Sequence, residues 1–323
     1  MQALRPHPHR GDIVAAGVVV LTVFVVLANL RFRGDWSDAV HFFVSLAFAA
    51  PILAMAVQAD AGDEQPRPYE SVLYVAAFIL LLQTLGTLSS LLGVDNGSFN
   101  GTWVSAVLIA VCVWFARARN SAIMTLLAAL TGVVGVLFLI DWIFNINGFN
   151  TVEWILFGCA LVLTLGAVSQ RDARRRHAVS LVDATGITVF FLGLMVFFES
   201  AARSLLAPFV GGDTISLGGI NPPRVSFGGS PAGWELVLLA FGFGLIAYGS
   251  VDRERVPAFL GFSVLALFVF EAFFPGEDGP SLIGWPVVLL ILGVVLLAIG
   301  LRPRQDLPPE PPVPTTTPSP PSS

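Results

Sequence analysis

The sequence has few charged residues, and none of its basic residues is lysine. Charged residues make up 12% of the 323 positions, whereas a soluble domain carries about a quarter. Hydrophobic residues make up 55%, and the mean hydropathy is +0.80. A chain of this length with so few charged residues cannot form the polar surface of a soluble protein. An ordinary soluble protein is therefore excluded. The net charge of −5 gives no basis for binding nucleic acid.

Residues that build metal, haem or disulfide sites are also scarce. The two cysteines, Cys112 and Cys159, lie inside apolar runs, where they behave as small hydrophobic residues. They cannot form a disulfide framework or a zinc site, and no pair among the four histidines has ligand spacing on a helix. Phosphate-binding loops, dinucleotide fingerprints and serine elbows are absent as well. The sequence therefore predicts no cofactor and no metal, and it does not favour an enzyme.

All seventeen basic residues are arginine, and alanine, glycine, valine and proline are abundant. This usage is typical of a GC-rich genome and indicates a bacterial source.

Apolar residues come in long runs separated by short polar joints. A bilayer core takes roughly 20 helical residues to cross, and the repetition of such runs predicts an all-α, polytopic helical membrane protein. The fourth span is the shortest and least regular. The ten predicted spans are 13–30, 39–58, 71–93, 102–116, 122–144, 152–169, 179–199, 232–250, 257–274 and 282–301.

The placement of arginine predicts the orientation. Thirteen of the seventeen arginines fall on one side if both termini are cytoplasmic, as expected from the excess of basic residues in cytoplasmic loops. Arg31 and Arg33 are exceptions on the outer side. The predicted organisation is a cytoplasmic segment 1–12, a ten-helix transmembrane domain 13–301 in the cell membrane, and a cytoplasmic tail 302–323.

Tryptophans support the same orientation. Each of the spans that run from outside to inside begins at or just after a tryptophan, and four of the five end in clustered arginines. Indole rings favour the headgroup region. Trp103 and Trp154 are 51 residues apart, as are Trp234 and Trp285. This spacing indicates either a repeated helical hairpin or the ordinary length of two spans and two loops.

Two segments depart from this regularity. Residues 200–231 form the one long external loop of the prediction, either a plain surface connection or a lid over a cavity, since long loops are often functional. Residues 302–323 are rich in proline, serine and threonine, a composition typical of disordered or polyproline-like tails. Such a tail is either simply solvated or binds a protein partner.

Acidic residues gather near the predicted outer ends of the spans. Asp141, Glu153, Glu199, Glu235 and Glu271 lie there, and Asp141 and Glu271 stand among large apolar residues. One interpretation is that these acids are solvated boundary residues. The other is a vestibule that concentrates cations, in which a buried carboxyl group could also carry a proton.

Other polar residues lie within the spans. Asp183 follows a run of arginines, so it forms either an ion pair with one of Arg174, Arg175 and Arg176 or part of a functional site. Gln83 and Thr84 form a polar patch that we expect to be satisfied by bonds between helices. Pro51 lies inside the second span and is a candidate hinge, because proline frees a carbonyl group of the preceding turn.

These features favour membrane transport or permeation of a small solute, with coupling to protons or cations. The alternative is a non-catalytic membrane component, such as a sensor, a scaffold or an accessory subunit. An enzyme that acts on lipid ranks third. Architecture alone does not decide between these functions.

Overall fold

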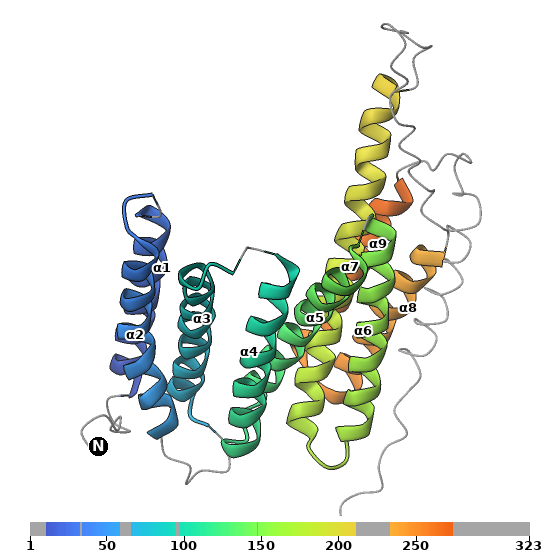
Figure 1. The fold of residues 1–323 in the computed structure, drawn as a ribbon. Helices are drawn as coiled ribbons and strands as arrows, with labels where there is room; N and C mark the ends of the chain where they lie inside the picture. Colours follow the sequence, from blue (N-terminus) through green and yellow to red (C-terminus); the bar gives the residue numbers. More distant parts are fainter. Residues whose placement is uncertain are drawn as a thin grey trace, which may run out of the picture. The chain divides into compact units, whose positions relative to one another are not determined.

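The computed structural model describes residues 11–32, 34–58, 66–94, 97–146, 148–210 and 233–273, with the backbone only for 200–210 and 271–273. Every helix or strand assigned in these ranges is an α-helix (Figure 1). A helix satisfies its own backbone N–H and C=O groups, as a chain in hydrocarbon must. The helices are α1 (Gly11–Arg31), α2 (Asp38–Gln58), α3 (Pro68–Leu91), α4 (Ser98–Ala118), α5 (Ala122–Phe144), α6 (Phe149–Gln170), α7 (Arg175–Val210), α8 (Gly233–Asp252) and α9 (Arg255–Phe273).

Eight helices of the described ranges are long and apolar enough to cross a bilayer. They are α1 to α6, α8, and α7 over Arg175–Glu199. Helix α9 carries a shorter apolar stretch, Arg255–Phe270. The predicted class, an all-α multi-pass membrane protein, is confirmed, and nine of the ten predicted spans coincide with helices. The tenth span, 282–301, and the tail 302–323 lie outside the described residues.

Two helices are longer than predicted by six residues or more. Helix α4 begins at Ser98 instead of residue 102, and the Thr102 hydroxyl donates to the Ser98 carbonyl at 2.8 Å. Helix α7 continues to Val210, so the prediction of a loop from residue 200 is wrong for its first eleven residues. The segment "SAARSLLA" is rich in strong helix formers, and the first Gly-Gly pair follows directly after the helix. Residues 211–231 lie outside the described residues.

The helices pack as successive hairpins. Helix α2 packs along α3, α4 along α5, α6 along α7 and α8 along α9. Short connections, such as residues 119–121 between α4 and α5, make partners antiparallel. The odd-numbered helices also contact one another in succession, from α1 through α3, α5 and α7 to α9. The packing therefore repeats hairpin by hairpin.

Large apolar side chains cover the outside of the helices. Phe144, Leu165 and Phe259 are 70% or more exposed, whereas Ser45 and Ala160 are fully buried. A monomeric soluble protein does not expose apolar surface on this scale. Lipid acyl chains cover such a surface without cost, because they are as apolar as the side chains. This distribution supports the membrane class independently of helix length.

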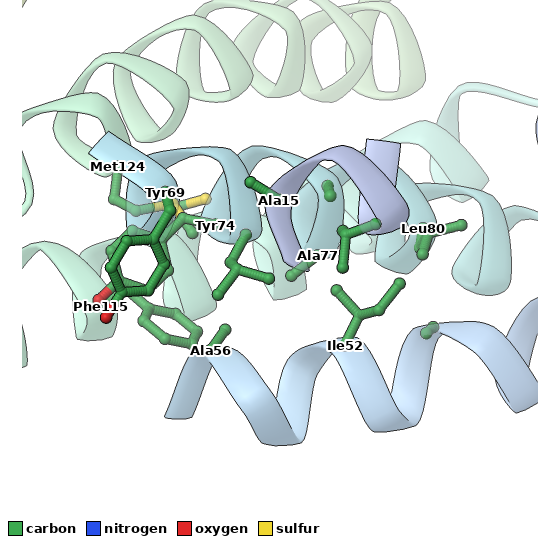
Figure 2. Close-up of a cluster of buried hydrophobic side chains, with 14 of the residues drawn as sticks. Ala15, Ile52, Ala56, Tyr69, Tyr74, Ala77, Leu80, Phe115 and Met124 are labelled. Atoms are coloured by element: carbon green, nitrogen blue, oxygen red, sulfur yellow. The ribbon is translucent and has the colours of Figure 1, made fainter. Parts of the chain in front are cut away.

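A cluster of buried apolar residues joins α1 to α5. Small residues such as Ala15, Ala56 and Ala77 let the helices approach (Figure 2). At one end of this cluster the rings of Tyr74 and Phe115 lie 5.2 Å apart. Without a hydrophobic force between helices in lipid, close van der Waals packing of this kind holds the bundle together.

Candidate functional site

Helices α6 and α8 run parallel and are joined at both ends. At their starts, the ring centroids of Trp154 and Trp234 lie 4.9 Å apart. At their other ends, the Arg171 guanidinium lies 3.3 Å from the Asp252 carboxylate. We call these the tryptophan end and the arginine end. They are 17 residues apart on α6, which is about 26 Å of helix and close to the thickness of a bilayer core.

Three glutamates lie at the tryptophan end. Glu153 precedes Trp154 on α6, and Glu235 follows Trp234 on α8. Helix α7 runs the opposite way, and its Val196 packs in one cluster with Trp234, so Glu199, one turn further on, belongs to this end as well. The structure thus brings Glu153 and Glu235 to the same end of the bundle. Glu199 was recognised from sequence only as one more acid near an outer boundary.

Glu153 is the most deeply buried of these acids. Its exposed fraction is 2%, and it is among the largest fully buried side chains of the described residues. It lies in the second turn of α6, beyond the first turn where an acidic side chain caps a helix. Glu235 is half-buried in the first turn of α8. Burial in protein distinguishes Glu153 from a boundary residue, which would face headgroups or water.

Asp141 anchors a turn. One carboxylate oxygen accepts a hydrogen bond from the Ile146 N–H at 3.0 Å, and the other accepts one from the Ser98 hydroxyl. The Asp141 carbonyl accepts a bond from the N–H of Asn145, which ends α5 in a left-handed conformation. Asp141 therefore joins the end of α5 to the start of α4, a sufficient structural reason for an acid at this place.

Asp183 lies within α7 and is not paired with the arginines just before it. In the described part of the chain, the ion pairs of Arg171 and Arg175 go to Asp252, at 3.3 and 3.6 Å. One Asp183 oxygen is buried and accepts no hydrogen bond from described residues. The ion-pair interpretation of Asp183 is thus not realised, because the end of α8 supplies a nearer acid.

The polar patch and the candidate hinge have ordinary surroundings. The Thr84 hydroxyl donates to the Leu80 carbonyl at 2.7 Å, within its own helix instead of across to a neighbour. The Gln83 side-chain oxygen is buried and has no hydrogen-bond partner among the described residues. Pro51 lies inside α2, which continues past it, and its ring is exposed. Glu271 belongs to α9, but its side chain is not described.

Two buried histidines were missed as centres of polar networks. His41 Nδ1 lies 2.5 Å from Asn29 Oδ1, and the Asn29 amide donates to Ser45 Oγ at 3.1 Å. His41, Asn29 and Ser45 thus form one buried polar network between α1 and α2. The sequence does not show this network, because the partner of His41 is an asparagine in the preceding span and not a second histidine.

The second network joins α5 and α7 at the arginine end. His177 Nδ1 lies 2.5 Å from the Thr125 hydroxyl oxygen, and Nε2 lies 2.9 Å from Asn120 Oδ1. His177 is 4% exposed. The sequence did not predict these hydrogen bonds, because it shows His177 only as a member of an arginine cluster and its partners lie more than fifty residues away. The described residues contain no cluster of three or more metal-ligating side chains.

The helices, their lipid-facing surface and their buried polar groups define a multi-pass helical membrane protein. No protein-family model matches the chain, and neither a curated protein nor a solved structure matches it.

Proposed function

We propose that the protein moves a small solute across the cell membrane and couples this movement to protons or cations through Glu153. The observation that carries the proposal is the burial of the Glu153 side chain, 2% exposed, inside an apolar span. Ionisable residues inside transmembrane segments are costly and are usually functional.

The surroundings of Glu153 support this role. Glu199 and Glu235 belong to the same end of α6, α7 and α8, and a group of acidic residues attracts ions of the opposite charge. A carboxyl group in such a place can bind a cation or exchange a proton as its surroundings change. With the arginine ends in the cytoplasm, as basic residues in short loops favour, the tryptophan end faces outward.

Glu70 is a second buried acid, and its structural role is defined by its hydrogen bond. It is 3% exposed, and its carboxylate accepts a hydrogen bond from the Arg67 backbone N–H at 3.0 Å in a capping box at the start of α3. Glutamine performs the same capping task. Glu70→Gln is therefore a matched control for Glu153→Gln, since both remove one buried negative charge.

The test uses the full-length protein in proteoliposomes with a pH-sensitive dye inside. Gradients of sodium, potassium, amino acids, sugars and lipophilic cations are imposed in turn, and the internal pH is recorded. We expect at least one gradient to move protons faster than in protein-free vesicles. Glu153→Gln should slow this movement at least tenfold, and Glu70→Gln should leave it unchanged. Equal rates in the two variants, or no movement above protein-free vesicles, would contradict the coupling. A folded protein without any flux would favour a non-catalytic membrane component.

A further inference from the structure

An apolar cleft lies between α6 and α8 toward the arginine end. Its volume is about 400 Å³, within the usual range for ligand pockets. Helix α6 forms one wall, α8 the other, and Val182 and Thr185 of α7 lie between them. Its lining runs from Thr164 to Arg171 on α6 and from Ala240 to Tyr248 on α8. On α8 the lining covers residues 240–248, or about 12 Å of helix.

The cleft exists because bulky contacts hold the two helices apart at one end. The Phe157 ring lies 5.8 Å from Trp234 and 6.4 Å from Phe241, so aromatic rings close the tryptophan end. Below them the α8 residue facing α6 is Gly244, and a methyl group added there would meet no other atom within 4 Å. Because α6 and α8 are in contact at both ends and Gly244 has no side chain, a space stays open between the two helices.

The walls favour a hydrocarbon chain over a polar solute. The Thr164 hydroxyl donates to the Ala160 carbonyl at 2.8 Å, and the Thr185 hydroxyl donates to the Leu181 carbonyl at 2.9 Å. Both hydroxyl groups are therefore bonded within their own helices. The remaining lining is mainly alanine, valine, leucine and phenylalanine.

The open end of the cleft carries excess positive charge. Residues 171–176 and 252–255 hold six arginines and three acids, an excess of three positive charges. The Arg171 side chain lines the cleft and is 52% exposed, and Arg175 beside it is 62% exposed. Asp252 contacts both guanidinium groups with one carboxylate oxygen, so it compensates them only in part. Basic pockets between transmembrane helices bind anionic lipid headgroups.

We propose that this cleft binds an anionic phospholipid, with part of one acyl chain between α6 and α8 and the phosphate group at Arg171. Apolar walls that open onto an arginine cluster at the depth of the headgroups match the two halves of such a lipid. A free phosphate ion would use the arginines and leave the walls empty. The inference does not depend on the proposed transport function.

The test is native mass spectrometry of the full-length protein in detergent. The probes are dioleoyl phosphatidylglycerol, dioleoyl phosphatidylcholine with the same chains, and glycerol 3-phosphate without chains. We expect tighter binding of phosphatidylglycerol than of phosphatidylcholine, and no retained glycerol 3-phosphate. Gly244→Leu fills the cleft and should weaken phosphatidylglycerol binding at least tenfold. Gly132→Leu, at another glycine with open space around it, is the control and should bind as the wild type does.

Two charge variants separate lipid binding from a merely structural ion pair. Arg171→Gln and Asp252→Asn both break the contact between α6 and α8. Arg171→Gln removes the phosphate ligand and should weaken phosphatidylglycerol binding about fivefold, as expected for one arginine near an anionic headgroup. Asp252→Asn frees two guanidinium groups and should strengthen the binding. Arg117→Gln, at an exposed arginine of α4, should change nothing.

Opposite effects of the two charge variants would support the site even if Gly244→Leu failed to fold. The proposal would be overturned by equal binding of the two lipids, by charge variants that shift binding in the same direction, or by full binding in a folded Gly244→Leu protein. Retention of glycerol 3-phosphate as tightly as the lipid would show a site for the phosphate group alone and would also overturn the proposal.

Discussion

Gly242 and Gly244 lie two residues apart on α8 and have opposite surroundings. A methyl group added at Gly242 would lie 2.6 Å from the Leu265 side chain and 3.3 Å from the Gly261 carbonyl oxygen of α9. At Gly244 it would meet nothing within 4 Å. One face of α8 is therefore packed backbone to backbone against α9, while the other opens onto the cleft toward α6.

The difference shows two uses of a small residue in a membrane bundle. Where both partners are small, as at Gly242 and Gly261, the helices approach closely and gain van der Waals contact. Where one partner helix is held away by rings, as Trp234 and Phe157 hold α6, a glycine leaves a space. The first use stabilises the fold, and the second makes room for a ligand.

The largest effect is expected at the packed face. In Gly261→Leu the added carbon would lie 2.6 Å from the Gly242 carbonyl oxygen and 2.9 Å from the Ile246 nitrogen. Backbone atoms cannot move aside as a side chain can, so we expect a loss of about 3 kcal/mol or more in the free energy of unfolding. The measurement is denaturation in mixed micelles. Gly244→Leu is the matched control and should stay close to the wild type. Similar losses in both variants would remove the distinction between the two faces.

A second comparison sets the interior of α1 to α5, where a cavity beside Phe115 measures only about 10 Å³, against the cleft of about 400 Å³. Phe115 is 1% exposed and contacts Tyr74, so Phe115→Ala leaves an enclosed cavity and should cost about 3 kcal/mol. Phe241 lies on the border of an existing cleft, where lipid or detergent can fill the space. Phe241→Ala should therefore cost about half as much or less. Equal costs measured in the same micelles would indicate that the cleft is closed in solution.

The His177 network is the third test. His177→Phe keeps a ring but leaves the Thr125 hydroxyl and the Asn120 side-chain oxygen without their bonds to His177. We expect a loss of about 1–2 kcal/mol in the free energy of unfolding. The neighbouring Arg176 is exposed, and Arg176→Gln should change stability by less than about 0.5 kcal/mol. A stable His177→Phe protein would show that the network does not hold α5 to α7.

The smallest effect on stability is expected at the arginine end. The Arg171 side chain is 52% exposed, and Arg175 stays within 3.6 Å of Asp252 when Arg171 is replaced. Arg171→Gln should therefore cost less than about 1 kcal/mol, while its effect on lipid binding is larger. A greater loss of stability than in Phe115→Ala would assign Arg171 to the fold instead of to a ligand.

The class of fold was predictable because it depends on the composition of successive segments of the chain and not on individual contacts. Runs of apolar residues, tryptophans and arginines locate nine helices and both ends of α6 and α8 without knowledge of any contact. Even the least regular span, α4, was found. The end of α7 was placed too early, because the loss of hydrophobicity after Glu199 marks the end of a span and not the end of a helix.

The individual sites were less predictable because they depend on partners far away in the sequence. Asp141 and Glu153 both precede a tryptophan, yet Asp141 bonds to Ser98 and Ile146, and Glu153 is enclosed between helices. Asp252 lies 81 residues after Arg171, so local charge pattern pointed to Asp183 instead. The glycines of "FGFG" look equivalent in sequence, and only the positions of α6 and α9 distinguish them.

The most direct test of the account asks whether α6 crosses a membrane with its arginine end inside the cell. Asn150→Cys and Asp172→Cys, at exposed positions beside its two ends, are each made in a protein with Cys112 and Cys159 replaced by alanine. A membrane-impermeant maleimide is then applied to intact cells. We expect Asn150→Cys to be labelled at once and Asp172→Cys only after the membrane is opened. Labelling of Asp172→Cys from outside the intact cell, or of both cysteines from the same side, would contradict the account.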